Sequence, residues 1–160
     1  MTVIIRAVQR RAIWLHVVLP VAMGAAIYVA WRSPSLNLFR WLDFLGLSSA
    51  AFALRALLGG VREFLPRILL FSGPDALWVY ALTSAMLLIW RGPTRSIRAW
   101  LWISAGFTIS FVTELGQALD RFPGTFDSAD LVCGFAAALL AIWNLRGKDG
   151  DIPCVVTSSA

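Results

Sequence analysis

Charged side chains are scarce in this 160-residue sequence, which has a single lysine and a single histidine. Aspartate, glutamate, lysine and arginine together make up 14% of the residues, whereas soluble domains hold roughly 25%. Apolar residues account for 59%, and the mean hydropathy is +0.74. This composition excludes an ordinary soluble globule. It predicts an integral membrane protein whose tryptophans form an interfacial belt near the ends of the apolar runs.

Arginine supplies nearly all of the positive charge behind the net charge of +5. The arginines flank the apolar runs singly or in threes, and no basic patch is interleaved with aromatic side chains. This pattern is typical of topology signals and headgroup contacts. We therefore expect no nucleic-acid partner.

Cysteine is also rare. Cys133 falls within an apolar run and Cys154 within the polar tail, so the two thiols are expected at different depths and a disulfide is not expected. No cysteine or histidine spacing matches a metal motif, so we expect no metal site and no cofactor. His16 stands alone in an apolar run and is interpreted as a packed interior residue.

The apolar runs predict an all-α fold, a polytopic transmembrane helix bundle over residues 1–146 with a polar tail over residues 147–160. Four runs are expected to cross the membrane: residues 12–31, 75–90, 99–119 and 130–145. Residues 38–58 are also helical in pattern, but Arg40, Asp43 and Arg55 leave only short uncharged stretches. We interpret that segment as an interfacial or re-entrant helix, while a full span remains the alternative.

The arginine and lysine distribution favours both termini in the cytoplasm. Four spans place eight basic residues inside and six outside, in the sense of the positive-inside rule. The inner set is Arg6, Arg10, Arg11, Arg91, Arg95, Arg98, Arg146 and Lys148, and the outer set is Arg32, Arg40, Arg55, Arg62, Arg67 and Arg121.

Four of the nine carboxylates lie in one stretch, residues 111–134, between the last two predicted spans. Glu114, Gln117 and Arg121 are spaced i, i+3 and i+7, which is one face of a helix if the helix continues that far. Asp127 and Asp130 open the next helix after a Pro-Gly reversal. This hairpin faces outward in the predicted topology.

The two aspartates and the glutamate invite different interpretations. Helix capping accounts for Asp127 and Asp130, and Asp75 suits the first turn of its own helix or could join the cluster. Glu114 lies deeper, where an ionisable side chain normally finds a partner and marks a functional site. Gln117 and Arg121 are the nearest candidate partners.

The stretch "TELGQALDRFPGTFDSADLVCGFAAALL" resembles the VanZ-like family of bacterial membrane proteins. The matching elements are a Glu-x-x-Gln pair, a Pro-Gly turn and an Asp-x-x-Asp pair, here Glu114, Gln117, Pro123, Gly124, Asp127 and Asp130. The turn arginine of the family is Thr125 in this chain. The resemblance implies a multi-pass protein of the bacterial cytoplasmic (inner) membrane. Such a protein would act at the outer face on the cell envelope or lipid-linked precursors and would be linked to glycopeptide resistance.

Three functions are consistent with the sequence. The first is binding of a membrane lipid or lipid-linked envelope precursor by Glu114, Gln117, Arg121, Asp127 and Asp130, with the outer arginines attracting phosphate and the carboxylates contacting amines, hydroxyls or a divalent cation. The second is an enzyme at the same site with Glu114 as base, although no nucleophile motif is present. The third is a non-catalytic assembly component or membrane effector that acts through helix packing and homo-oligomerisation of the small-residue stripe "GFAAALLA".

Overall fold

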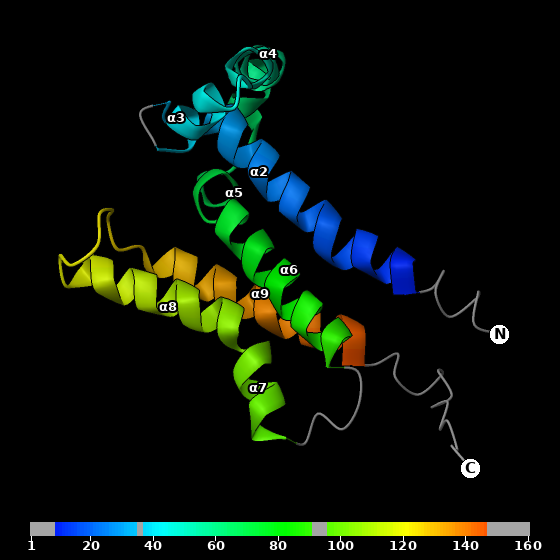
Figure 1. The fold of residues 1–160 in the computed structure, drawn as a ribbon. Coiled ribbons are helices and arrows are strands. Elements are labelled where there is room, and N and C mark those ends of the chain that lie inside the picture. Colours follow the sequence, from blue (N-terminus) through cyan, green and yellow to red (C-terminus); the bar gives the residue numbers. More distant parts are fainter. Residues whose placement is uncertain (1–8, 35–36, 91–95, 147–160) are drawn as a thin grey trace.

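The computed structural model describes residues 9–34, 37–90 and 96–146, apart from the side chain of residue 146, and the regular elements in these ranges are all helical (Figure 1). The predicted all-α class is therefore confirmed. The predicted tail, residues 147–160, lies outside the described residues, as do Arg6, Arg91, Arg95, Lys148 and Cys154. In chain order the elements are η1 (Trp14–Val18), α2 (Leu19–Trp31), α3 (Asn37–Phe44), α4 (Ser48–Leu58), η2 (Gly59–Phe64), α5 (Arg67–Phe71), α6 (Gly73–Ile89), α7 (Ile97–Ile103), α8 (Ala105–Ala118) and α9 (Ser128–Arg146).

Helix α6 is the central element of the bundle. It packs against α2, α8 and α9, and α8 also packs against α9 (Figure 1). Small residues allow two of these close approaches, because a Cβ atom added at Gly24 would lie 2.7 Å from Nε1 of Trp78, and one at Gly106 would lie 3.3 Å from the carbonyl oxygen of Val79. Packing through small residues is typical of helices in membranes.

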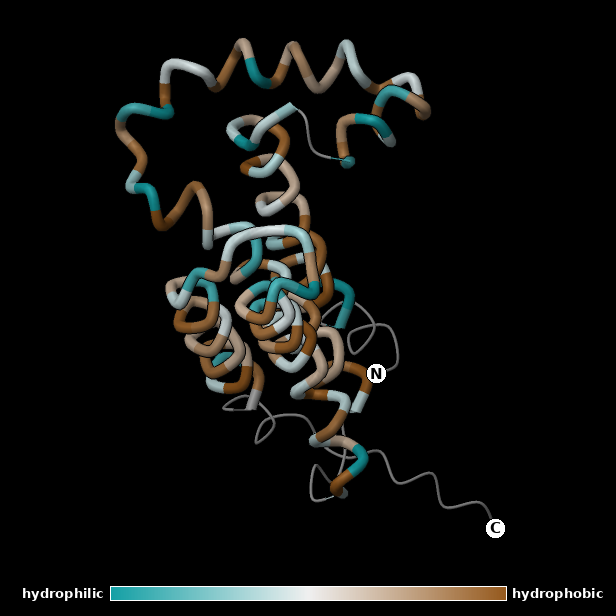
Figure 2. The backbone as a smooth tube through the Cα atoms, turned by 90° about the vertical axis from the view of Figure 1, so that its left-hand side faces the viewer, coloured by the Kyte–Doolittle hydropathy of each residue, from teal (hydrophilic) through white to brown (hydrophobic). Residues whose placement is uncertain are grey.

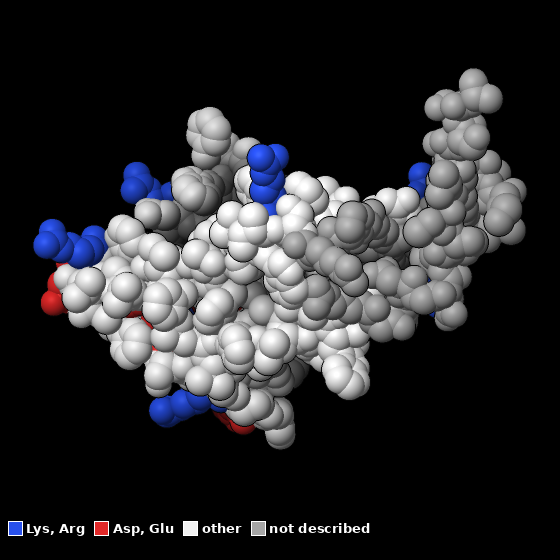
Figure 3. Space-filling view, turned by 90° about the horizontal axis from the view of Figure 1, so that it is seen from below, with Lys and Arg blue, Asp and Glu red and all other residues white. Residues whose placement is uncertain are grey.

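Two helices are long and apolar enough to cross a membrane, Gln9–Trp31 and Ser128–Leu145. A helix in the core of a soluble protein can be equally apolar, but it is mostly buried. Here only 11% and 17% of the two most apolar windows are buried. Many large apolar side chains are therefore exposed on the outside of the helices. Much of the helical backbone belongs to hydrophobic residues (Figure 2), and the face seen in Figure 3 is mostly uncharged, with most of its charged side chains at the margins.

The four runs predicted as spans are helical, with shifted or broken ends, but among the described residues only the first and the last of them form helices that are long and apolar enough to cross a membrane. The run predicted over residues 75–90 is the 17-residue helix α6, and the run over residues 130–145 begins two residues earlier, at Ser128. The run over residues 99–119 is divided at Ser104 into α7 and α8, which lie at an angle to each other (Figure 1). The first run contains a π-helical turn, in which the amide of Leu19 bonds to the carbonyl of Trp14, directly before Pro20. The wider turn accommodates the proline, which has no N–H and whose ring would crowd the carbonyl four residues earlier.

The segment predicted as one interfacial or re-entrant helix over residues 38–58 is two helices. Gly46 has a φ of 69° and ends α3, with its amide bonded to the carbonyl of Asp43 and that of Leu47 bonded to the carbonyl of Leu42. This is the Schellman arrangement, which favours glycine because of its positive φ. Helices α3 and α4 lie together at one end of the bundle, beyond α2 (Figures 1 and 2). Neither is long enough to span the membrane.

Candidate functional site

A hollow at the α8–α9 hairpin end of the molecule brings together four of the five predicted site residues. Glu114, Gln117, Asp127 and Asp130 line a cavity of about 680 Å³ together with Asp75 and residues of α2, α6, α8 and the hairpin loop. We call this cavity the acidic groove, after its carboxylates on Asp75, Glu114, Asp127 and Asp130.

Glu114 is the most buried of the predicted residues, with 6% of its surface exposed. Its Oε2 atom accepts a hydrogen bond of 2.9 Å from the backbone N–H of Asp127. The carboxylate therefore joins the last turns of α8 to the start of α9. The sequence suggested Gln117 or Arg121 as the nearest partner of Glu114, but the hydrogen bond in the structure comes from the backbone amide of Asp127, which no side-chain pattern reveals.

Asp127 is the N-cap of α9. Its Oδ1 atom accepts a hydrogen bond of 2.8 Å from the N–H of Ala129, and its carbonyl accepts the N–H of Asp130 at 3.1 Å. The predicted capping role is thus confirmed for Asp127. The side chain of Asp130 differs, because its Oδ1 atom is buried and no described residue hydrogen-bonds to it. A buried carboxylate oxygen without a protein partner is costly, and it is open to a ligand donor.

Asp75 and Arg32 complete the charged lining of the groove. Asp75 lies in the first turn of α6 and joins the cluster, where it is within electrostatic range of Asp130, Arg32 and Glu114. Arg32 ends α2, and its guanidinium lies 5.4 Å from the ring centres of both Tyr28 and Phe71. The signal for Arg32 in the sequence is its position as the first charge after a long apolar run.

Arg121 is exposed and does not line the acidic groove. The shared face predicted with Glu114 and Gln117 required a helix that continues to residue 121, whereas α8 ends at Ala118. Asp120 has a φ of 52°, and the amide of Arg121 bonds back to the carbonyl of Gly116 at 2.7 Å. This Schellman ending turns the chain off the helix axis before Arg121.

The hairpin loop folds back onto α8 through two glycines. A Cβ atom at Gly116 would overlap the ring of Phe122, and one at Gly124, where φ is 134°, would lie 2.6 Å from Nε2 of Gln117. The loop therefore covers the last turn of α8, and it contributes Gly124 and its two neighbours to the groove lining.

A second polar cluster joins η1, α6 and α9. Nδ1 of His16 lies 2.7 Å from the hydroxyl oxygen of Tyr80, which also accepts a hydrogen bond of 3.2 Å from Nδ2 of Asn144. His16 is half-buried and hydrogen-bonded, in agreement with its interpretation as a packed residue. Sequence reasoning overlooked Tyr80 and Asn144, although an asparagine inside an apolar run is itself a signal of an interhelical hydrogen bond.

The groove is equipped for binding by hydrogen bonds and charge. In residues 9–34, 37–90 and 96–146 no group of three or more His, Cys, Asp or Glu side chains is placed to hold a metal ion. The hydroxyl of Thr113, which lines the groove, donates a hydrogen bond of 2.9 Å to the carbonyl of Ile109. The single histidine of the sequence, His16, contacts Tyr80 outside the groove. Carboxylates with one guanidinium suit the hydroxyl or amine groups of a ligand.

Comparisons of the chain with models of protein families, with curated proteins and with solved structures found no match.

Proposed function

We propose that this chain is an integral protein of the bacterial cytoplasmic membrane that binds the polar headgroup of a membrane lipid, or of a lipid-linked envelope precursor, at the outer face. The observation that carries the proposal is the burial of Glu114 in a carboxylate-lined groove at one end of otherwise apolar helices. An ionisable side chain within a membrane-spanning helix normally faces the bundle interior and marks a functional site; its cost is roughly 2.5–3.5 kcal/mol at mid-membrane and less toward the membrane surface, where the groove lies.

Four passes of the membrane agree with the helix arrangement. The helices Gln9–Trp31 and α9 supply two passes. Helix α6 has 17 residues, which at 1.5 Å per residue reach about 26 Å, close to the ~30 Å of a hydrocarbon core. Helices α7 and α8 together supply the fourth pass, with a bend at Ser104. The positive-inside rule then places both termini in the cytoplasm and the acidic groove outside.

The rim of the groove suits an amphiphilic ligand. Ile109, Phe71 and Trp78 line it and are 62%, 44% and 37% exposed. These side chains continue into the apolar outer surface of the helices. A lipid could therefore keep its acyl chain along this surface while its headgroup occupies the polar interior.

The small-residue stripe of α9 argues for binding over assembly. Gly134 is buried, and a Cβ atom added there would meet Oγ of Ser110 and Cγ2 of Val79 within the same chain, at 3.6 and 3.7 Å. The stripe is thus used for packing between α9, α8 and α6. The resemblance to VanZ-like proteins, and the link to glycopeptide resistance that it implies, remain predictions from the sequence.

Glu114→Gln tests the proposal. Native mass spectrometry of the full-length protein, extracted with a mild non-ionic detergent, should show a lipid adduct retained from the membrane. We expect Glu114→Gln and Asp130→Asn each to lower the retained fraction by about tenfold, because a hydrogen bond to a charged group contributes roughly 1.5–3 kcal/mol.

Asp43→Asn is the matched control, since Asp43 is an exposed carboxylate outside the groove. Glu114→Gln should also unfold at the wild-type temperature, because the amide oxygen of glutamine can still accept the N–H of Asp127. Equal lipid retention by Glu114→Gln and the wild type would contradict the proposed site. Equal loss in Asp43→Asn would show that overall charge, and not the groove, retains the lipid.

A further inference from the structure

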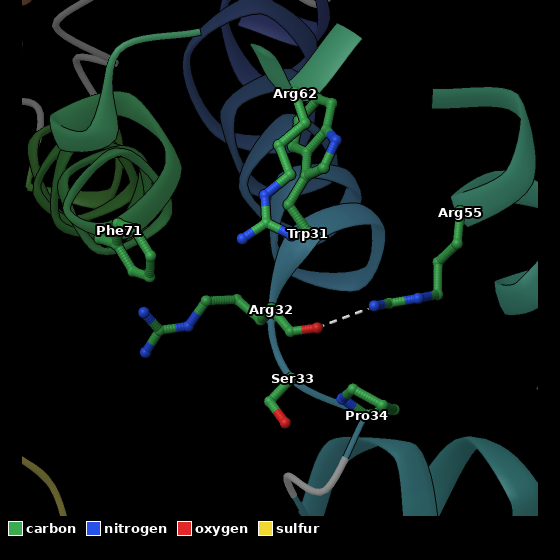
Figure 4. A pocket seen from close by; sticks show the side chains of 7 residues that line it. All are labelled: Trp31, Arg32, Ser33, Pro34, Arg55, Arg62 and Phe71. Carbon is green, nitrogen blue, oxygen red and sulfur yellow. Dashed lines mark hydrogen bonds between the residues drawn. The ribbon is translucent and has the colours of Figure 1, made fainter. Parts of the chain in front are cut away.

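A second cavity adjoins the acidic groove and has the opposite charge. It has a volume of about 420 Å³ and is lined by Trp31, Arg32, Ser33, Pro34, Arg55, Arg62 and Phe71 (Figure 4). Three of these residues are arginines and none is a carboxylate. We call this cavity the arginine pocket. It lies where the end of α2 meets α4, η2 and α5.

Arg55 is fixed in place before any ligand arrives. Its Nη1 atom donates hydrogen bonds of 2.7 and 2.8 Å to the carbonyls of Val29 and Arg32, and its guanidinium lies 5.3 Å from the ring centre of Phe39. Both of these hydrogen bonds use the same nitrogen, Nη1, and Arg55 lines the cavity. An arginine held in this way loses little side-chain entropy on binding.

The other two arginines line the same cavity from different elements. Arg32 lies against the rings of Tyr28 and Phe71, and the exposed side chain of Arg62 extends beside Trp31 toward Arg32 (Figure 4). The indole N–H of Trp31 donates to the carbonyl of Leu58 at 3.1 Å, which ties α2 to the end of α4. Three like charges around one hollow repel one another unless an anion lies between them.

We propose that the arginine pocket binds a phosphate group. Guanidinium groups match the tetrahedral oxygens of phosphate with paired hydrogen bonds, and three of them exceed what a carboxylate ligand needs. Arg32 and Phe71 line both cavities. A single ligand can therefore place its phosphate among the arginines and a hydroxyl or amine in the acidic groove. This second step rests on the function proposed above, whereas phosphate binding rests on the arginine pocket alone.

Two sources of phosphate are separated by two binding measurements on the full-length protein in non-ionic detergent. In the first, inorganic phosphate is titrated at constant ionic strength against chloride, and binding is read from the apparent Tm. In the second, the protein is exchanged into nanodiscs that contain phosphatidylglycerol and phosphatidylcholine, and native mass spectrometry after release counts which lipid is retained. Tm shifts alone indicate a soluble phosphate ligand, and preferential retention of phosphatidylglycerol indicates a lipid. Either result supports the arginine pocket, and the absence of both overturns it.

Arg62→Gln is the decisive variant, with Arg67→Gln as its matched control. Both arginines are exposed. Arg62 belongs to η2 and Arg67 to the next element, α5, but Arg67 does not line the pocket. We expect Arg62→Gln to weaken binding of the retained phosphate ligand by about tenfold and Arg67→Gln to leave it unchanged. Equal weakening in both variants would show that phosphate binding comes from general attraction between a basic surface and anions, and not from the arginine pocket. Glu114 does not line the arginine pocket, so Glu114→Gln should leave the affinity for inorganic phosphate unchanged even where it lowers lipid retention, and the two proposals can fail separately.

Discussion

Asp120 determines where α8 ends and thus how the hairpin loop reaches the acidic groove. Its positive φ of 52° is a conformation that costs most residues about 1–2 kcal/mol, and glycine, asparagine and aspartate pay the least. We expect Asp120→Val to lower the free energy of unfolding by about 1–2 kcal/mol, because a β-branched side chain tolerates this backbone poorly. Thermal unfolding in detergent, followed by circular dichroism, measures the change.

Asp120→Gly is the control for this prediction. It removes the same carboxylate but adopts a positive φ without strain, so its apparent Tm should equal or exceed that of the wild type. If glycine and valine destabilised the protein equally, the carboxylate of Asp120, and not its backbone, would hold the turn.

Single residues also mark the limit of sequence reasoning about the site. The N-cap role of Asp127 could be predicted, because an aspartate before an apolar helical run has a local signature. The bond from the N–H of Asp127 to Glu114 could not, since it joins residues 13 apart through a turn whose path depends on Asp120. The same turn removed Arg121 from the predicted cluster. Asp75, for which the sequence left a first-turn role and membership of the cluster open, lines the groove, as does Arg32.

At the scale of elements, Arg55 connects α4 to the end of α2. The carbonyls of Val29 and Arg32 belong to the last turn of α2 and its cap, where unpaired carbonyls and the helix dipole favour a cation. We expect Arg55→Met to lower the free energy of unfolding by about 1–2 kcal/mol, since it removes the charge-assisted hydrogen bonds and keeps the apolar stem.

Arg40→Met is a suitable comparison for Arg55→Met, because Arg40 is an exposed arginine of α3. Apparent Tm values in the same detergent should fall for Arg55→Met and stay within error for Arg40→Met. A wild-type Tm for Arg55→Met would mean that α4 is held by Trp31 and apolar packing alone.

The elements themselves were largely predictable, while their interruptions were not. Apolar runs located α6 and α9 to within two residues at their starts. The break of the third run at Ser104 has no strong sequence signal, because no proline or glycine occupies that position. The break at Gly46 does have one, a glycine followed by a leucine and two serines. The helix end at this glycine can be recognised only together with the nearby charged residues, because these exclude a continuous membrane span.

At the scale of the whole molecule, polar and apolar surfaces are segregated. Apolar side chains cover most of the outside of the bundle, and the carboxylates of the acidic groove and the arginines of the arginine pocket lie at the end where the hairpin, α3 and α4 are found (Figure 1). A bilayer around the helices would therefore leave both cavities at one membrane surface. The arginine distribution of the sequence predicts that this is the outer surface.

The orientation can be measured with cysteines at the two ends of the bundle. Replacing Cys133 by alanine leaves Cys154 as the single thiol in the tail, and the triple variant Thr125→Cys, Cys133→Ala, Cys154→Ser places one thiol in the hairpin loop. We expect a membrane-impermeant maleimide to label residue 125 in intact spheroplasts, because Thr125 is exposed at the groove. Cys154 should react only after the membrane is permeabilised, because the positive-inside rule places the tail in the cytoplasm. Labelling of residue 125 only after permeabilisation would show that the bundle has the opposite orientation in the membrane. It would then assign both cavities to the cytoplasmic surface, where a soluble phosphate ester could reach the arginine pocket directly.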